Sequence, residues 1–510
     1  MLYACCFFVS SYGKRNSAIG IFFGIVLKSN AWIRNRAQLI EIRMQSPLGA
    51  RKMLVRHLVP FAVWCFVLPV SLWGSVAGQM EIRRIPVAKG LASHPVNGGN
   101  CLISDGQFQH IAFYDGEHRM TVGKRKLGEA QWDLVRLPER VGWDTHNRVI
   151  LFQDREGYLH VTGNMHCKPL RYYRTKAPAD IHTFEAIHTW AGYYEDRVTY
   201  PSLLKLRDGS IYMMYRHGGS GNGMRILVHY DEQTQQWTKT VPALTNGRDR
   251  NPTCNAYPFG VLSQETAGEI ATSGILEDKE GLWHIAWCWR ETPDVVTNFD
   301  VCYAKSPDRG ISWKTWDGRD LELPITPENA GVVEHIAQKS GLMNGGTLVA
   351  DGEGLPYISY TRFDEDGHNQ LYVATPLDGR WKIIQLTDWK HRFYFEGRGA
   401  ISSSPPVPRL SITKDEKIRV TYSYAHAEPR KGQFVLTREQ LLAAKPGRHP
   451  IEKSQAPYAA LPYIRAGNHG PLPPGQIHYM QQQTDAPNRD RKPENPRQPT
   501  MIYVVEVKKQ

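Results

Sequence analysis

The sequence predicts an all-β fold of the β-propeller type, with four-stranded antiparallel blades, because a hairpin recurs along the chain. Strand-turn-strand segments occur six times within the 510 residues, at steps of about 51, 52, 72, 73 and 62 residues. Their turns centre on Asp105-Gly106, Glu156-Gly157, Asp208-Gly209, Glu280-Gly281, Glu353-Gly354 and Asp415-Glu416. A weaker second hairpin, often marked by a tryptophan, follows these segments. Two hairpins per unit give the four strands of a propeller blade.

The runs between the turns are typical of strands rather than helices. Residues 159–162 and 211–215 are short, rich in β-forming residues and bounded by turn residues. Residues 306–313 read Ser-Pro-Asp-Arg-Gly-Ile-Ser-Trp, which fits the Asp-box pattern Ser-x-Asp-x-Gly-x-x-Trp. In such a box the Asp and the Gly form a tight turn while the Trp packs between blades. We therefore expect a structural role for Trp313.

The N-terminal part of the chain predicts export. From Met53, a short basic start, an uncharged stretch over 58–73 and the small residues of 75–77 fit a signal peptide at 53–78. Its apolar stretch is short for a membrane span and contains two prolines. We expect a secreted or periplasmic protein with no permanent membrane span. Residues 1–52 are then an extension that precedes the true start and belongs to no domain.

The centre of the chain, residues 79–444, is expected to form the propeller. Residues 445–510 are rich in Pro, Gln, Asn and Arg, a composition that buries little apolar surface. Within this tail, residues 501–507 read Met-Ile-Tyr-Val-Val-Glu-Val and predict a strand. Such a strand could pair with the first blade, close the ring and remove an exposed sheet edge.

The formal net charge of +12 does not predict a nucleic-acid partner. Residues 1–78 hold nine basic and one acidic residue, and residues 445–510 hold ten basic and five acidic residues. The propeller segment is left with a formal charge of −1, so a global basic surface is not indicated.

The cysteines that follow the predicted signal peptide do not describe a disulfide framework, because they are odd in number and widely spaced. They are Cys101, Cys167, Cys254, Cys288 and Cys302. Cys288 and His284 with a distant third ligand would make a zinc site, but a buried packing role is favoured. The metal is left unassigned, and a structural zinc or calcium ion stays an open alternative.

Two copies of the repeat place chemically versatile residues at their open ends. His146 lies eight residues before the turn of its hairpin, and His166 lies nine residues after it. In the next copy, Tyr200 precedes the turn by eight residues and Arg216 follows it by seven. At about 3.3 Å per residue, antiparallel strands put these residues at one rim, roughly 25 Å from the turns. Each residue alone is more often a packing or surface residue, but together they predict a site for proton transfer and anion binding.

The segments that carry these residues also bear a family resemblance. They read Gly142-Trp143-Asp144-Thr145-His146-Asn147, Gly163-Asn164-Met165-His166, Val198-Thr199-Tyr200-Pro201 and Tyr215-Arg216-His217-Gly218-Gly219-Ser220-Gly221-Asn222-Gly223. The chain resembles, over most of residues 90–435, the BNR-repeat family that includes the seven-bladed propeller ulvan lyases. The resemblance implies a seven-bladed β-propeller and a catalytic site formed by His146, His166, Tyr200 and Arg216. The metal ligands of that family have no match in this sequence.

The chemistry of such a lyase needs these residue types. The enzyme removes the C5 proton of a uronic acid, which is poorly acidic while the neighbouring carboxylate stays charged, and then expels the C4 oxygen. Arg216 would neutralise the carboxylate. Tyr200 and His146 are the candidate base and acid, and His166 would orient the carboxylate or support its partner. Tyr200 would need a lowered pKa, which Arg216 favours. No cofactor is required.

The expected function is therefore a secreted, monomeric polysaccharide lyase that cleaves an acidic, uronic-acid-containing, ulvan-like polysaccharide by β-elimination. Further candidate substrate-binding residues are Asn147, Asn164, Arg290, Arg362 and His426, the last three at equivalent rim positions of later blades. Two alternatives stay open. A sialidase-like glycoside hydrolase also uses a propeller with Asp boxes, although only one clear box is present. A non-catalytic glycan-binding propeller would keep the cationic rim without needing the tyrosine or the histidines.

Overall fold

The computed structural model describes residues 80–92, 100–262, 270–271, 274–399, 408–448, 452–453, 464–485 and 490–509. They all lie in the second of two compact units, Val76–Gln510. The expected extension 1–52 and signal peptide 53–78 lie outside the described residues. Within the described ranges, no helix is both long and apolar enough to cross a membrane.

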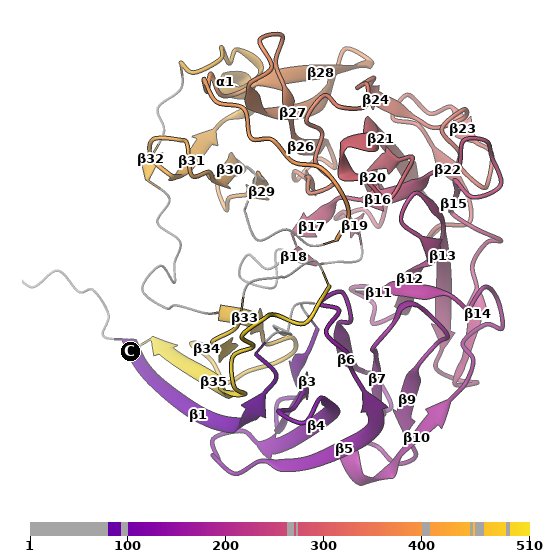
Figure 1. The fold of residues 1–510 in the computed structure, drawn as a ribbon, viewed down its shortest axis with the longest axis vertical. Coiled ribbons are helices and arrows are strands. Elements are labelled where there is room, and N and C mark those ends of the chain that lie inside the picture. The colour runs from indigo at the N-terminus through magenta and orange to yellow at the C-terminus, as the bar shows by residue number, and fades with distance from the viewer. Residues whose placement is uncertain are drawn as a thin grey trace, which may run out of the picture. The chain divides into compact units, whose positions relative to one another are not determined.

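The strands form sheets that stand around a central axis, so the predicted all-β propeller is confirmed (Figure 1). The described strands belong to seven sheets. We number six of them as blades, since each is built from strands that lie near one another along the chain. The seventh, named the closing sheet, joins the N-terminal strand β1 (Met80–Gly90) to three C-terminal strands.

The first three blades span residues 102–246. Blade 1 contains β2 (Leu102–Ser104), β3 (Phe108–Tyr114), β4 (Arg119–Lys126) and β5 (Asp133–Arg140). Blade 2 contains β6 (Val149–Gln153), β7 (Leu159–Gly163), β9 (Tyr172–Thr175) and β10 (Phe184–Ile187). Blade 3 contains β8 (His166–Lys168), β11 (Val198–Lys205), β12 (Ile211–Gly219), β13 (Asn222–Asp231), β14 (Gln236–Lys239) and β15 (Thr245–Asn246).

The other three blades follow. Blade 4 contains β16 (Asn255–Pro258), β19 (Ile275–Glu277), β20 (Trp283–Arg290), β21 (Asn298–Ser306), β22 (Trp313–Lys314), β23 (Asp320–Leu321) and β24 (Val332–Glu334). Blade 5 contains β17 (Gly260–Leu262), β18 (Ile270–Ala271), β25 (Thr347–Ala350), β26 (Pro356–Phe363), β27 (Asn369–Leu377) and β28 (Arg380–Gln385). Blade 6 contains β29 (Arg409–Ile412), β30 (Ile418–Ser423), β31 (Lys431–Leu436) and β32 (Glu452–Lys453). Short helices are η1 (Ile181–Thr183), η2 (Val295–Thr297) and α1 (Arg438–Leu442).

The prediction of seven equivalent four-stranded blades was wrong. The structure has six blades and a composite closing sheet, and blades 3, 4 and 5 have six, seven and six strands. The extra strands arise where the chain passes from one blade to the next and pairs briefly with the neighbouring sheet. β8, for example, follows β7 of blade 2 in sequence but pairs with β11 of blade 3.

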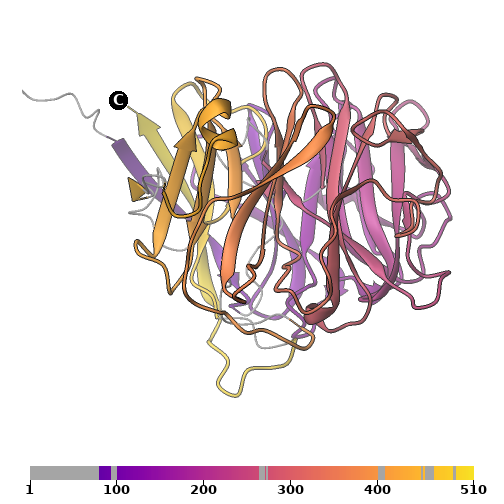
Figure 2. The same cartoon turned by 90° about the horizontal axis from the view of Figure 1, so that it is seen from above.

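The closing sheet brings the two ends of the described chain together. Its order is β1-β35-β34-β33, with β33 (Ile464–Gly467), β34 (Gln476–Gln482) and β35 (Thr500–Lys509). β1 and β35 pair antiparallel from Met80 with Lys509 to Gly90 with Thr500, and both ribbon views show them side by side (Figures 1 and 2). β35 contains the segment 501–507. Residues after 444 therefore supply three strands of this sheet. β35 is paired on both sides, while β1 and β33 are the edge strands.

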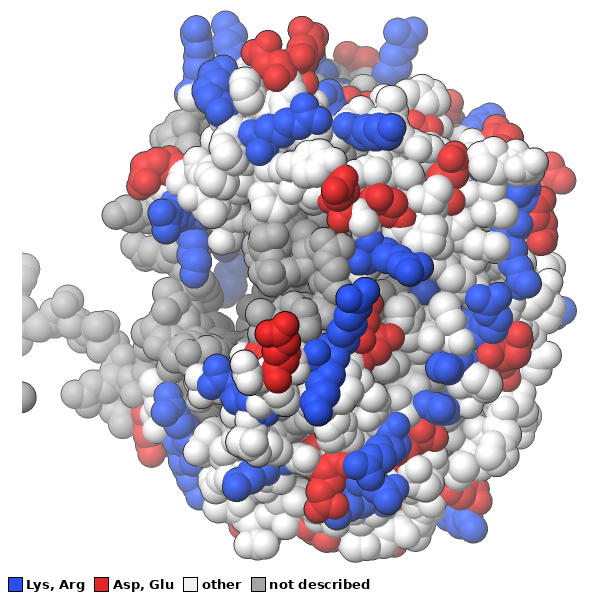
Figure 3. Space-filling model, in the orientation of Figure 1, with Lys and Arg blue, Asp and Glu red and all other residues white. Residues whose placement is uncertain are grey.

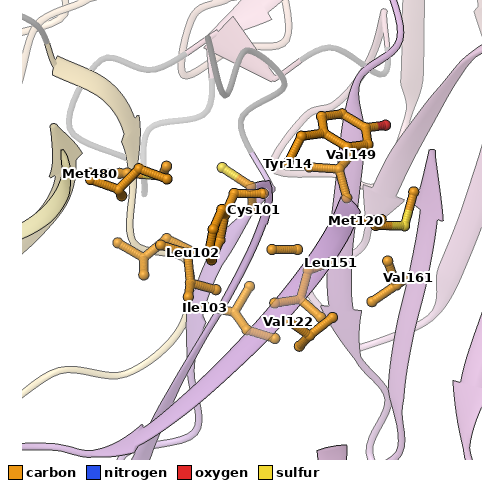
Figure 4. Packing of buried hydrophobic residues seen from close by; sticks show 14 of the residues in the cluster. Cys101, Leu102, Ile103, Tyr114, Met120, Val122, Val149, Leu151, Val161 and Met480 are labelled. Atoms are coloured by element: carbon orange, nitrogen blue, oxygen red, sulfur yellow. The ribbon is translucent and has the colours of Figure 1, made fainter. Parts of the chain in front are cut away.

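The hydrophobic core lies between neighbouring sheets. The first cluster joins the closing sheet to blades 1 and 2: Met480 of β34 approaches Leu102 of β2, while Val122, Leu151 and Val161 continue the same layer (Figure 4). Further clusters link blades 2 and 3, 3 and 4, 4 and 5, and 5 and 6. Because alternate strand residues face each seam, the sheets are held by apolar burial rather than by backbone pairing alone.

The Asp box forms the turn predicted for it. Ser306 Oγ accepts a hydrogen bond from the Gly310 amide at 2.8 Å, and Asp308 Oδ1 accepts one from the Ser312 amide at 2.8 Å. Gly310 has a φ of +89°, and a Cβ there would lie 2.8 Å from Leu227 of blade 3. Trp313 is fully buried and donates from Nε1 to the Gly310 carbonyl. The structural role expected for Trp313 is confirmed.

Trp313→Ala is expected to lower the free energy of unfolding by about 3–5 kcal/mol, because it leaves a cavity between blades 3 and 4. Urea unfolding monitored by circular dichroism checks this value. Ile311→Ala is the matched control, since Ile311 lies in the same box but is 63% exposed. Equal unfolding midpoints for the two variants would contradict the packing role of Trp313.

The charged residues are mixed on the face seen in Figure 3. Lys and Arg side chains alternate there with Asp and Glu. Several charged side chains of the molecule are paired, such as Arg362 with Glu334 and Arg250 with Glu328. No extended surface of one sign covers the described part of this face. The arrangement agrees with the near-neutral charge of the propeller segment and offers no broad track for a nucleic-acid backbone.

Candidate active site

Strand β11 organises the candidate site because it pairs with two strands that carry predicted site residues. Thr199 of β11 lies opposite Arg216 of β12 on one side and opposite His166 of β8 on the other. The chain leaves the β6–β7 hairpin at Asn164, which has a φ of +59°, and His166 starts a new strand of blade 3. His166 therefore does not end the return strand of its own hairpin, as the repeat geometry predicts. The four predicted residues still meet, at the seam between blades 2 and 3.

A β-bulge aims Tyr200 into the site. The register of β11 against β12 shifts between Thr199 and Ser202, and Tyr200 has a φ of +52°. A non-glycine residue in the left-handed region costs about 1–3 kcal/mol, and the following Pro201 disfavours it further. Bulges of this kind redirect a side chain at functional sites. Here the Tyr200 ring lies 5.8 Å from the His146 ring and 6.0 Å from the His166 ring, centroid to centroid.

Asp144 links the two histidines. Its Oδ1 lies 2.8 Å from His146 Nδ1 and its Oδ2 lies 2.5 Å from His166 Nδ1, and the two imidazole rings are 4.6 Å apart. Oδ1 also accepts the His146 amide at 3.0 Å. Burial raises the pKa of Asp144, but the hydrogen bonds from both histidines outweigh burial and hold that pKa well below its ordinary value. Asp144 is therefore an ionised carboxylate that fixes the orientation of both rings.

Asp144, His146 and His166 are also a candidate metal site. In the described residues they are the one group of three or more His, Cys, Asp or Glu side chains whose ligand atoms all lie within 4.8 Å of one another. Two ligands of a tetrahedral zinc ion, each about 2.0 Å from the metal, would be about 3.3 Å apart. The observed Nδ1–Oδ separations of 2.8 and 2.5 Å are shorter and fit direct hydrogen bonds. We interpret the trio as a hydrogen-bonded unit and not as a ligand set.

The pKa of Tyr200 differs from the expectation. Burial raises it to about 12, although the guanidinium groups of Arg216 and Arg148 oppose this shift. Their Cζ atoms lie 5.1 Å and 5.6 Å from the centre of the Tyr200 ring. The prediction of a lowered pKa was wrong, because sequence spacing shows the nearby cation but not the loss of solvent around the phenol.

Three buried arginines lie around Tyr200 and Tyr257. Arg216, Arg225 and Arg290 are 1%, 4% and 8% exposed, and none of them contacts a carboxylate of the described residues. Their hydrogen-bond partners are neutral: the Gly218 carbonyl, Tyr257 hydroxyl and Cys167 thiol for Arg216, the Ala256 carbonyl for Arg225, and the Asn298 and Asn344 amides for Arg290. Burial lowers the pKa of Arg225 to about 9. Buried cations without a counter-ion are costly, so the site is built to receive an anion.

Tyr257 of β16 stands at the centre of these arginines. Its hydroxyl lies 3.5 Å from Arg216 Nη1 and 2.5 Å from Ser220 Oγ, and Arg290 Cζ lies 4.4 Å from its ring centre. Burial raises the pKa of this phenol, but Arg290, Arg216 and the Ser220 hydroxyl outweigh burial, and the pKa lies below its ordinary value. Tyr257, rather than Tyr200, is thus the tyrosine that the cations favour as an anion.

The remaining predicted residues have other surroundings. Asn147 donates from Nδ2 to the Asp144 carbonyl within the same turn. Asn164 is buried and donates to Glu139 at 2.8 Å, so its side chain serves the local fold. Arg362 forms an ion pair with Glu334 at 2.8 Å, and His426 stacks on His391 at 3.5 Å. Neither of these contacts joins Arg362 or His426 to the cluster of His146, His166, Tyr200 and Arg216.

The histidine considered for a zinc site lies in a packing position. His284 Nδ1 lies 2.6 Å from the Tyr303 hydroxyl, and Nε2 lies 3.0 Å from Asp278 Oδ2. His160 in blade 2 has the same two kinds of partner, Tyr172 and Asp154. Both ring nitrogens of His284 are therefore engaged. The described cysteines are all free thiols.

Sequence reasoning missed several residues of the site. Asp144 stands two residues before His146, a spacing that places a carboxylate beside the same turn, and it could have been found there. Tyr257 and Arg225 come from strand interiors with no motif of their own. Asp490, which lies 2.8 Å from His146 Nδ1, comes from the C-terminal segment and has no signal in the spacing of the repeats.

Known proteins resemble the chain in sequence. A family model described as BNR repeat-containing family member matches residues 108–389. An ulvan lyase from Alteromonas sp. (strain LOR) is 21% identical over 346 residues, which cover 64% of this chain and 67% of that protein. An ulvan lyase named Ulvan Lyase-PL25, from Pseudoalteromonas sp. (strain PLSV), is 23% identical over 358 residues, 62% of this chain and 64% of its own length. A short ulvan lyase isoform from the same Alteromonas strain is matched over 31% of its length, so the chain spans less than two thirds of some relatives.

Solved structures share the fold. The polysaccharide lyase Uly1 matches with a TM-score of 0.55 at 13% identity, over 84% of this chain and 99% of that structure. An ulvan lyase described as a new polysaccharide lyase family, PL25, matches with a TM-score of 0.51 at 14% identity, over 79% and 94%. At these identities the likeness concerns the arrangement of the strands.

Proposed function

Because the chain belongs to the BNR repeat-containing family, we propose that it is a polysaccharide lyase that cleaves a uronic-acid-containing, ulvan-like polysaccharide by β-elimination. Similarity to ulvan lyases over more than 340 residues supports the reaction class. The signal-like segment 53–78 supports action outside the cytoplasm, and the protein is proposed to act as a monomer. The geometry of the site supports separate roles for its residues in carboxylate binding, proton acceptance and proton donation.

The observation that carries the proposal is the group of buried arginines beside a tyrosine and two histidines. A uronate brings one carboxylate per residue, and a buried guanidinium is the side chain best suited to bind it in two-pronged fashion. Arg216 lies nearest to Tyr200, so its guanidinium would hold the carboxylate next to the reacting C5 carbon. Neutralising that carboxylate makes the C5 proton more acidic and stabilises the enolate-like charge.

The elimination then needs a base and an acid. Tyr200 would accept the C5 proton, the C5–H electron pair would form the C4=C5 double bond, and the C4–O bond would break. The leaving oxygen would take a proton from an imidazole. Since the pKa of Tyr200 is about 12, only a small fraction is phenolate at neutral pH, and the rate should rise with pH. His166, held by Asp144, would help to orient the substrate carboxylate.

The test is incubation of the protein with a panel of acidic polysaccharides, including ulvan and glycosaminoglycans. A new ultraviolet absorbance from the unsaturated uronate is the expected result. Release of reducing ends without that absorbance would show hydrolysis and favour the sialidase-like alternative. Binding to a polymer without either product would favour a glycan-binding propeller, and both of these results would contradict the lyase proposal.

A further inference from the structure

The connection between β34 and β35 is unusually long for neighbouring antiparallel strands. It runs from residue 483 to residue 499, whereas hairpin loops commonly have about two to five residues. Its stem is fixed: Asp485 accepts from the Arg497 backbone amide at 3.0 Å and from Arg497 Nε at 3.1 Å, and Thr500 Oγ1 donates to the Gln483 carbonyl at 2.6 Å. Long loops with pinned stems are commonly functional.

This loop reaches the segment that carries His146. Asp490 Oδ1 lies 2.8 Å from His146 Nδ1, and the Asp490 side chain is 23% exposed. Two residues further on, Lys492 Nζ lies 5.6 Å from the centre of the Trp143 ring. The Trp143 ring in turn packs edge-on against His118, with centroids 5.0 Å apart. The loop therefore contacts residues 143–146 at two points.

The contact makes the two histidines chemically different. His146 Nδ1 faces two carboxylates, Asp144 and Asp490, each at 2.8 Å. Among the carboxylates of the described residues, His166 Nδ1 contacts Asp144 alone. Two carboxylates on one side of a ring favour the imidazolium, and both contacts use Nδ1. Nε2 of His146 is left as the nitrogen that can give a proton to a substrate.

We propose that Asp490 is a positioning residue of the active site, which holds His146 by Nδ1 together with Asp144 and so presents Nε2–H as the proton donor to the leaving C4 oxygen. This inference rests on the proposed lyase function and assigns the acid of that reaction. In the step, the C4–O electron pair stays on the leaving oxygen, which takes the Nε2 proton, and His146 becomes neutral. Water then returns the proton to His146.

The electrostatic surroundings of His146 support the assignment. The ionisable groups that lie against it are Asp144, Asp490, His166 and Tyr200. Two cations lie one ring further away, Arg148 over Tyr200 and Lys492 over Trp143. Burial lowers the pKa of His146, but the hydrogen bonds and charges of Asp144 and Asp490 outweigh burial and raise it to about 9. His146 is therefore mostly protonated below about pH 9 and mostly neutral above it. At neutral pH it can donate a proton but cannot accept one.

The first test reads His146 directly and needs no substrate. Nuclear magnetic resonance of ring-labelled histidine, assigned with His146→Gln, gives the titration midpoint of His146. Asp490→Asn is expected to lower this midpoint by about one pH unit or more. Glu494→Gln, which changes an exposed carboxylate of the same loop, is the matched control and is expected to leave it unchanged, while Asp490→Glu should restore most of the shift. An unmoved midpoint in Asp490→Asn would overturn the proposal, whatever the substrate is.

The second test uses elimination activity across pH. For a donor, Asp490→Asn should leave kcat/KM near pH 6 almost unchanged. Near pH 9 it should lower kcat/KM by about fivefold for a midpoint shift of one pH unit, and by about tenfold more for each further unit. For a base, the same variant would raise kcat/KM near pH 7, and that sign would overturn the donor role. A moved midpoint with no elimination on any polymer would leave Asp490 as the partner of His146 and reject the lyase function instead.

Discussion

Tyr200→Phe is expected to lower kcat by about two orders of magnitude or more, with substrate binding nearly kept. The phenyl ring preserves the packing against both histidines, but the phenol that would accept the C5 proton is gone. Stopped-flow or steady-state absorbance of the unsaturated product gives kcat, and KM or a binding assay gives the affinity. Because Tyr200 sits in a strained bulge, its position is fixed before the substrate arrives.

Tyr158→Phe is the control for this experiment, since Tyr158 lies at the turn of the β6–β7 hairpin, at the far end from the site. It should keep wild-type kcat. Near-normal turnover in Tyr200→Phe, with an intact circular dichroism spectrum, would remove Tyr200 as the base. The proton would then be accepted by one of the histidines or by Tyr257, whose pKa is lowered by its surrounding cations.

Arg216→Lys is expected to reduce kcat/KM by about 10²-fold or more, and here both KM and kcat should change. Lysine keeps the charge but has no planar fork, so it would hold the substrate carboxylate at one point only. It would also lose the donation from Nε to the Gly218 carbonyl, which fixes the guanidinium in the site. The change in KM reports the ground-state contact, and the change in kcat reports stabilisation of the developing enolate.

Arg362→Lys serves as the comparison for Arg216→Lys. Arg362 is already neutralised by Glu334, with Nη2–Oε1 at 2.8 Å. Its other hydrogen bonds go to the Phe363 carbonyl and the Tyr372 hydroxyl, and not to Tyr200. We expect at most a few-fold effect on kcat/KM from that variant. Equal losses in the two variants would indicate a general cationic surface instead of a defined carboxylate site around Arg216.

Part of this site could be predicted from the sequence because propeller hairpins place chain positions at a rim by simple counting. Counting about the turns predicted that His146, His166, Tyr200 and Arg216 share one rim. They do meet, but His166 reaches the site through β8 of blade 3 and not at the end of its own hairpin. Counting could not show that Asn164 and Tyr200 adopt left-handed backbone angles, because neither is glycine. The left-handed turn at Asn164 directs His166 into blade 3, and the one at Tyr200 turns its side chain out of the regular strand pattern. The sign of the Tyr200 pKa shift was missed for a related reason, since burial depends on what the bulge packs against.

The fold was predictable in kind and not in detail. Turn residues and the Asp box indicate blades, but brief pairing between consecutive blades, such as β8 with β11, arises from chain crossings that have no pattern of their own. Asp490 shows the same limit at the site. Its partner His146 is more than 340 positions away, and only the pairing of β34 and β35 in the closing sheet brings the loop there.

The closing sheet has a consequence for how the chain is made. β1 leaves the ribosome well before its partner β35, because about 410 residues separate Gly90 from Thr500. At about 5–20 residues per second, β1 waits roughly 20 to 80 s for the strand that will cover its edge. During this interval the nascent strand could pair with other chains, and its charged residues Arg83, Arg84 and Lys89 oppose such pairing. The ring can therefore close only after β35 has been made, and the polypeptide stays an open arc of blades until then.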